Sequence, residues 1–244
     1  MPLDNINLVI STVCREENYL EATLRSLAED NPIGFDQTVS LVVGSPVTAY
    51  LDHHRLRAGV TVIEMGPNAW AWIKNSNVFH RASWNYYRCL TRCAEGTRGT
   101  LIVEDDVQFA RGWRARLDCT LMAMEEHYGA DFVLAVYEPW TFPLLGHLYA
   151  EYPRAKFFGT QAVYYTAKTR DGFAKYLKAH GLAANENGYD YLLRDYLLKA
   201  DLPLFATTPS LVQHIGKKTT GLGIWHYSSN FMEDVTLESS EQPR

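Results

Sequence analysis

Three adjacent acidic residues, Glu104, Asp105 and Asp106, follow the apolar run at residues 100–103. The run predicts a buried strand, so the acids stand at the carboxyl end of a strand, where ligands gather in open α/β sheets. Adjacent carboxylates repel one another unless a cation or hydrogen-bond donors offset their charge. Magnesium and manganese prefer carboxylate oxygens. The cluster therefore predicts a divalent-metal site, with a solvated acidic turn as the alternative.

A metal held in this way suits the cleavage of a sugar–diphosphate bond. The departing nucleotide carries two or more negative charges, and an ion that bridges both phosphates stabilises them without proton transfer. We expect Asp106 to reach the metal. Glu104 and Asp105 are expected to contact the nucleotide or to orient the waters of the metal.

Composition and charge exclude several classes of protein. The 244 residues include 47% hydrophobic and 21% charged residues, which is ordinary for a soluble globular protein. The formal net charge of -5 leaves no basic field for nucleic acid or an anionic membrane surface. No apolar stretch approaches the roughly 20 residues needed to cross a bilayer, and no basic region precedes the first apolar run. We therefore expect a cytoplasmic protein without a transmembrane segment.

The elements that must position the acids alternate between strand and helix, which is typical of a mostly parallel central sheet flanked by helices. Strands are expected at 7–12, 38–43, 60–63, 100–103, 131–137 and 156–166, and helices at 19–28, 79–94, 111–128, 170–179 and 189–200. The segment from Gly66 to Val78 lacks a clear period and predicts an ordered loop. Because neither a repeat nor a linker divides the chain, we expect a single domain over 1–244, with a flexible tail from about residue 237.

Three segments together resemble the N-acetylglucosaminyltransferase IV family. Residues 11–15, Ser-Thr-Val-Cys-Arg, followed by Tyr-Leu at 19–20 and a leucine-rich helix, resemble the opening strand, loop and helix of that family. Residues 103–107, Val-Glu-Asp-Asp-Val, resemble its metal motif, which many glycosyltransferases share. Residues 209–216, Pro-Ser-Leu-Val-Gln-His-Ile-Gly, are similar to its late and more specific motif. The likeness runs in the right order from about residue 8 to about residue 220.

The resemblance implies a fold and an activity. The fold would be the GT-A type, a Rossmann-like α/β fold of nucleotide-diphospho-sugar transferases. The activity would be inverting, metal-dependent transfer with Mn²⁺ or Mg²⁺. The donor would be a UDP-sugar, in particular UDP-GlcNAc, and the acceptor a glycan or another hydroxyl compound.

The resemblance also implies a second metal ligand, His214, which would coordinate the ion together with Asp106. Imidazole is a good ligand for manganese. Taken alone, a histidine in a loop is more often a hydrogen-bonded structural residue.

Asp190 is the candidate general base. An inverting transfer needs one base to take the proton of the acceptor hydroxyl. Asp190 follows the polar run 185–188 and opens a predicted helix, a position that resembles that of the catalytic carboxylate in this fold. The alternative is that Asp190 only complements the helix dipole, and Glu186 and Asp195 are the reserve candidates.

Several further residues are candidates for binding the donor. Those at the end of the first strand would contact base, ribose or phosphate, two basic residues would counter the diphosphate, and one polar residue in the predicted strand 156–166 would face the donor sugar. In that order they are Thr12, Val13 and Arg15, then Lys74 and Arg81, then Gln161.

Two more segments have expected roles. Trp140 and Phe142 would form a platform for the apolar face of an acceptor sugar. The basic pair at 217–218, with the glycines at 221 and 223, would close over the diphosphate as a lid.

Two other functions compete with glycosyl transfer. A metal-dependent phosphoesterase or nucleotidyltransferase would also use acids at strand ends, but it would normally need two metals. The adjacent histidines His53 and His54 are the only dense pair of histidines that could supply ligands for a second metal. The second alternative is an inactive nucleotide-sugar-binding module, against which the combination of Asp106, Asp190 and His214 argues.

Overall fold

A central sheet of eight strands organises the described part of the chain. The computed structural model describes residues 6–29, 39–46, 49–52, 59–92, 97–139, 148–182, 187–218 and 225–235. In spatial order the strands are β3 (Val60–Ile63), β2 (Val39–Val43), β1 (Ile6–Thr12), β4 (Gly99–Glu104), β8 (Ala162–Thr166), β6 (Val133–Ala135), β9 (Leu204–Thr207) and β7 (Tyr149–Glu151).

Most of these strands run in one direction. Strands β3, β2, β1 and β4 are mutually parallel, and β6 is parallel to β9. Strand β8 pairs antiparallel with both β4 and β6, and β7 pairs antiparallel with β9. Only β8 and β7 therefore oppose the other strands, which confirms the predicted mostly parallel α/β sheet.

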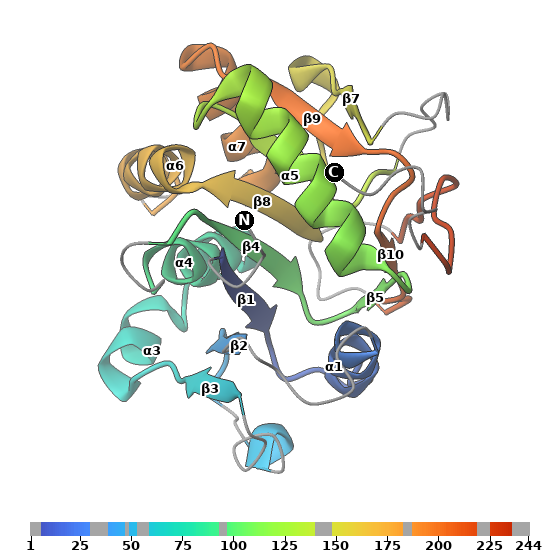
Figure 1. Ribbon diagram of the computed structural model, residues 1–244. Coiled ribbons are helices and arrows are strands. Elements are labelled where there is room, and N and C mark those ends of the chain that lie inside the picture. Colours follow the sequence, from blue (N-terminus) through green and yellow to red (C-terminus); the bar gives the residue numbers. More distant parts are fainter. Residues whose placement is uncertain are drawn as a thin grey trace.

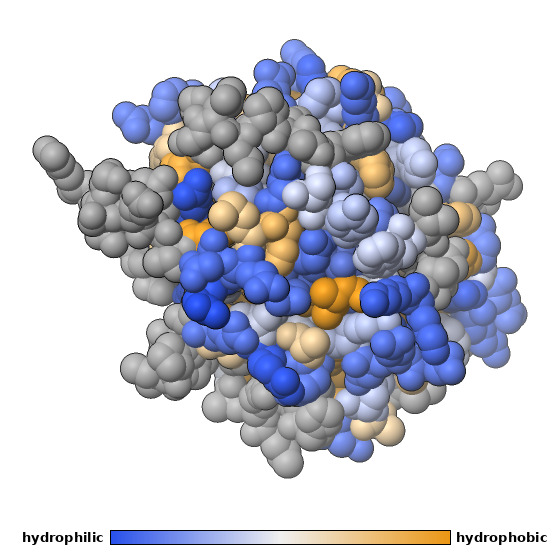
Figure 2. Space-filling model, turned by 90° about the vertical axis from the view of Figure 1, so that its right-hand side faces the viewer, coloured by the Kyte–Doolittle hydropathy of each residue, from blue (hydrophilic) through white to orange (hydrophobic). Residues whose placement is uncertain are grey.

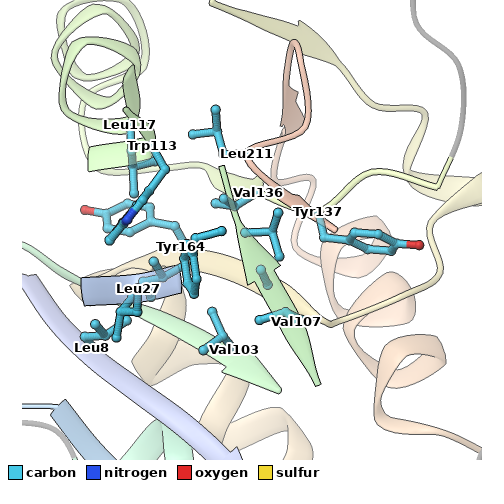
Figure 3. Close-up of a cluster of buried hydrophobic side chains, with 14 of the residues drawn as sticks. Leu8, Leu27, Val103, Val107, Trp113, Leu117, Val136, Tyr137, Tyr164 and Leu211 are labelled. Atoms are coloured by element: carbon cyan, nitrogen blue, oxygen red, sulfur yellow. The ribbon is translucent and has the colours of Figure 1, made fainter. Parts of the chain in front are cut away.

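Helices cover both faces of the sheet. In Figure 1, α5 (Trp113–Tyr128) crosses the near face, and α1 (Leu20–Ala28) packs into the same core. Helices α4 (Val78–Thr91), α6 (Ala167–His180) and α7 (Tyr189–Lys199) pack into a second core. The alternation of strand side chains supplies both cores, because Ile10 faces the first and Val9 the second. Figure 3 shows the first core, where Leu8, Val103 and Tyr164 of the sheet meet Leu27 and Leu117 of the helices.

A second, two-stranded sheet joins the acidic cluster to the segment around His214. Strand β5 (Val107–Phe109) pairs antiparallel with β10 (Val212–His214), so that His214 lies opposite Val107. The backbone N–H of Ile215 also donates to the carbonyl oxygen of Asp106 at 2.9 Å. The acidic cluster and the late motif are therefore held side by side by backbone hydrogen bonds.

Two local expectations were wrong. The segment after Gly66 is not a loop, because Pro67 starts the helix α3 (Pro67–Ile73), where its fixed φ suits the first helical position. The predicted strand 156–166 is shortened to β8, because a 3₁₀ turn (Arg154–Lys156) and the left-handed Gly159, with φ +86°, precede it. In addition, the sequence did not indicate β5, β7, β9 or β10, and His214 is the last residue of β10.

Some expectations fall outside the described residues. They concern His53, His54, Trp140, Phe142, Glu186, the glycines at 221 and 223, and the tail from residue 237. Within the ranges that the structure describes, no helix is both long enough and apolar enough to cross a membrane.

Candidate functional site

Asp105 and Asp106 form the tight turn between β4 and β5, and both are buried, with 1% and 5% of their surface exposed. A single guanidinium lies between them. Arg15 Nη1 donates to Asp106 Oδ2 at 2.7 Å, and Arg15 Nη2 donates to Asp105 Oδ1. Charge-assisted hydrogen bonds of this kind are what allow adjacent carboxylates to be buried. Arg15 is therefore the cation that faces the acidic cluster in this structure.

Asp105 accepts hydrogen bonds from residues at the end of strand β1. Thr12 Oγ1 donates to Asp105 Oδ2 at 2.6 Å, and the backbone N–H of Val13 donates to the same oxygen at 3.3 Å. Burial raises the pKa of Asp105 to about 6, although Arg15 and the two donors favour its charged form. The side chains of Thr12 and Asp105 thus bond to each other and hold the loop that carries Val13 and Arg15.

Asp106 faces His214. Nε2 of His214 lies 3.4 Å from Asp106 Oδ2, and its Nδ1 donates to the carbonyl oxygen of His226 at 3.0 Å. Burial raises the pKa of Asp106, but the contacts with His214 and Arg15 outweigh it and lower the pKa below its usual value. Because Nδ1 donates to a carbonyl oxygen, Nε2 can donate to Asp106 only when the ring is protonated. Burial lowers the pKa of His214, but the hydrogen bond to Asp106 and its negative charge outweigh burial and raise that pKa above its usual value. Nε2 is the nitrogen that a metal could bind once this proton has left.

The pair formed by Asp106 and His214 fits one divalent ion. Asp106 Oδ1 is buried and has no hydrogen-bond partner among the described residues. Neighbouring ligands of a small octahedral cation are about 3 Å apart, which is close to the separation between Nε2 and Oδ2. An oxygen and an imidazole nitrogen are donors that manganese accepts. Within the described ranges, no group of three His, Cys, Asp or Glu side chains converges.

The late motif ends in glycine, Gly216, because there is no room for a side chain at this position. A Cβ atom on Gly216 would lie 2.1 Å from Asp106 Oδ2 and 2.7 Å from Asp106 Cγ. No side chain can occupy that space unless the carboxylate moves.

Replacing Gly216 with Ala should therefore displace the Asp106 carboxylate. The overlap should destabilise the fold by about 1–3 kcal/mol and weaken manganese binding, which thermal unfolding and electron paramagnetic resonance of free Mn²⁺ would measure. Gly66→Ala is the matched control, because a Cβ there meets nothing within 4 Å. Unchanged manganese binding by the Gly216 variant would contradict the role given to Asp106.

Two adjoining cavities open at this site. The first, of about 260 Å³, is lined by Asp106, His214, Gln161, Asp190 and Lys218, among others. The second, of about 240 Å³, is lined by Val13, Gly44, Trp70, Arg81 and Asn85, among others. Arg15, Glu104 and Tyr189 line both cavities and so form the wall between them. Figure 2 shows the side of the molecule toward which several of the sheet's arrows point in Figure 1; hydrophilic and pale residues predominate there among the coloured atoms.

Asp190 lies in the first turn of α7 and lines the same cavity as Asp106 and His214. Burial raises its pKa, although backbone N–H groups of Tyr191, of Asp190 itself and of Gly159 partly offset the effect. The reserve candidate Asp195 lies on the same helix with about half of its side chain exposed, beside Arg194. The structure therefore brings the predicted base and the predicted metal ligands together.

Glu104 is bound by a residue that sequence reasoning missed. The hydroxyl of Tyr189 donates to Glu104 Oε1 at 2.6 Å, and the Tyr189 ring stacks on Tyr86 with centroids 4.4 Å apart. Burial, followed by the charge of Asp106, raises the pKa of Glu104 to about 7. Tyr189 thus links the helix that carries Asp190 to the acidic cluster.

His226 is a second missed residue. It lines the first cavity, and its Nδ1 lies 2.7 Å from the hydroxyl of Tyr137. Burial, together with the charge of His214, lowers its pKa to about 4. His226 is therefore neutral at pH 7. The pairing of His226 with His214 leaves no periodic signal in the sequence that could have indicated it.

The remaining predicted residues lie in three different settings. Arg81 lines the second cavity and donates from Nη1 to the carbonyl oxygen of Ser76 at 2.5 Å. Lys218 lines the first cavity and pairs with Glu16 at 3.4 Å. Lys74 is exposed at the end of α3 and lies outside both cavities. Arg81 is thus near the site, whereas Lys74 is not.

Comparisons with known proteins bear on the fold. No protein-family model matches the sequence, and no curated protein matches it significantly. Among solved structures, S. aureus TarS, a GT-A-like glycosyltransferase, aligns over 83% of this chain with 16% identity and a TM-score of 0.50. The chain spans about a third of TarS, 35% of its length. The galactosyltransferase LgtC, solved with donor and acceptor sugar analogues, aligns over 79% of this chain and 70% of its own, with 12% identity and a TM-score of 0.46. On the alignment with TarS and the topology of the sheet, the chain has the α/β fold found in GT-A glycosyltransferases.

Proposed function

We propose that this chain is a metal-dependent, inverting glycosyltransferase that moves a sugar from a UDP-sugar to a hydroxyl group of a glycan or another acceptor. The observation that carries the proposal is the meeting of Asp106, His214 and Asp190 in one cavity. Two ligands for one metal ion and a separate carboxylate are the parts that an inverting transfer with a diphosphate leaving group needs. The GT-A fold agrees with this use of the site.

The donor would extend across both cavities. The second cavity, beside Val13 and Asn85, would take the nucleoside, and the wall residue Arg15 would meet the diphosphate. Asp106 and His214 would hold Mn²⁺ or Mg²⁺, which would stabilise the negative charge of the departing diphosphate. Lys218 lies in the first cavity and adds a positive charge on that side.

Asp190 would perform the proton transfer. As the acceptor oxygen attacks the anomeric carbon from the face opposite the diphosphate, its hydroxyl proton passes to the Asp190 carboxylate. The bond from the carbon to the acceptor oxygen forms while the bond to the diphosphate breaks, so the anomeric configuration inverts. A carboxylate whose pKa is raised by burial is a stronger base than an exposed one, which suits this role.

The finer assignment rests on the motifs. The likeness of the three motifs supports membership of the N-acetylglucosaminyltransferase IV family and, with it, UDP-GlcNAc as donor, and the close fit of Gly216 to Asp106 gives one of these motifs a structural reason. A two-metal phosphoesterase would need further ligands beside Asp106 and His214. The described residues supply no third His, Cys, Asp or Glu to such a group.

The proposal is tested by calorimetric titration of UDP into the protein, once with manganese and once with a chelator. We expect measurable binding with manganese and at least about tenfold weaker binding without it, because the ion would bridge the diphosphate to Asp106 and His214. ADP and GDP serve as controls for the base. The absence of UDP binding under both conditions would refute the proposal.

A further inference from the structure

Two exposed aromatic residues line the first cavity beside Asp190. Tyr191 and Trp225 are each 45% exposed, and they come from separate parts of the chain, α7 and the segment 225–235. A single exposed aromatic side chain is ordinary on a protein surface, but two that line one cavity with polar groups are typical of a ligand site. The position of this pair suggests a ligand that is next to the candidate base and is not the nucleotide.

Each ring has a neighbour that fixes its orientation. The Arg194 guanidinium carbon lies 4.8 Å from the centroid of the Tyr191 ring. Trp225 stacks on Tyr227 with centroids 5.4 Å apart and an interplanar angle of 27°. A ring that is supported in this way and still almost half exposed offers the rest of its surface to a ligand without having to become ordered first.

An unsatisfied polar atom lies in the same cavity. Gln161 is only 8% exposed, and its Oε1 atom is buried without a hydrogen-bond partner in the part of the chain described. A buried carbonyl oxygen of this kind requires a hydrogen-bond donor. Gly159 allows the close packing, because a Cβ there would lie 2.9 Å from Gln161 Oε1. The cavity therefore calls for a ligand that combines an apolar face with hydroxyl groups.

From these contacts we propose that the part of the first cavity next to Asp190 is a subsite for a neutral pyranose as acceptor, stacked on Trp225 and Tyr191. One face of a pyranose presents C–H groups, which the negative face of an aromatic ring attracts. Asp190 immediately precedes Tyr191 and lines this cavity, so its carboxylate disfavours an anionic acceptor beside the two rings. The inference rests on the proposed function and names the class of its second substrate.

The test is saturation-transfer NMR with the full chain, UDP and magnesium, using the methyl glycosides of glucose, galactose, mannose and N-acetylglucosamine as probes. We expect at least one probe to bind the wild type. Trp225→Ala and Tyr191→Ala should weaken that binding about tenfold, whereas Trp225→Phe should keep most of it because an aromatic face remains. Trp72→Ala is the matched control, since Trp72 is an equally accessible tryptophan, 55% exposed, outside both cavities.

The outcomes separate this inference from the proposed function. Equal binding by the wild type and both alanine variants, or no binding of any of the four probes, would overturn the pyranose subsite. If UDP still binds with manganese in those cases, the donor site stands and only the acceptor class is wrong. Binding of a glycoside that depends on Trp225 in a protein that does not bind UDP would keep the subsite and refute glycosyl transfer.

Discussion

Replacing Asp190 with Asn should lower the rate of sugar transfer by about 10²–10⁴-fold, the usual contribution of a general base. The amide cannot accept the proton of the acceptor hydroxyl. UDP binding in the presence of manganese should stay unchanged, because Asp190 lies outside the second cavity and is not one of the two proposed metal ligands, Asp106 and His214. Initial rates of transfer from a radiolabelled UDP-sugar and calorimetric titration of UDP would measure the two quantities.

Asp195→Asn is the matched control, because it removes the same charge from the exposed side of the same helix. It should leave both transfer and stability unchanged. Asp190→Asn should not destabilise the fold either, since burial raises the pKa of Asp190 and so disfavours its charged form. Normal transfer by the Asp190 variant would show that another group is the base.

The raised pKa of Asp190 also sets the direction of the pH dependence. The base must be deprotonated, so transfer should fall as the pH is lowered through its folded pKa. Because burial raises that pKa, the fall should occur above the value of about 3.9 that is usual for an aspartate. The pH profile of the residual activity of Asp190→Asn should lack this acidic limb.

Replacing Asp106 with Asn should abolish the manganese-dependent part of UDP binding. Loss of a residue that hydrogen-bonds to a metal ligand costs about 10–100-fold in metal affinity, so loss of a direct ligand should lower the manganese affinity by at least about 100-fold. The buried Oδ1 atom that could face a cation would no longer carry negative charge. Titration of UDP with manganese and with a chelator should then give the same weak binding.

Asp105→Asn is the matched control for this variant. Either substitution leaves Arg15 paired with the other carboxylate. Asp106→Asn should destabilise the fold, because the contacts of Asp106 outweigh burial and lower its pKa, whereas Asp105→Asn should have a smaller effect, because burial raises the pKa of Asp105. Only the Asp106 variant should lose the effect of manganese, because Asp105 is bonded to Thr12 and Val13 instead. Retention of manganese-dependent binding by Asp106→Asn would remove Asp106 from the proposed metal site.

Much of the architecture could be predicted from local patterns. The apolar runs and helical periods indicated strands β1 to β4, β6 and β8 and helices α1 and α4 to α7, since those patterns reflect which face of an element is buried. They did not indicate the short strands β5, β7, β9 and β10. The acids after β4 and the position of Asp190 at the start of α7 could be read in the same way. Two further failures were local, because the start of α3 depends on one proline and the shortened β8 on the backbone of Gly159.

The sequence by itself therefore determined the fold class and the chemical types at the site, whereas the tertiary structure decided which groups meet. Arg15 pairs with Asp106 across a separation of 91 residues, and His214 does so across 108. Tyr189 reaches Glu104, and His226 orients His214, through contacts that no spacing predicts. The physical reason is that periodicity reports burial within one element, while the pairing of buried polar groups depends on strand register and on the packing of elements that are distant in sequence.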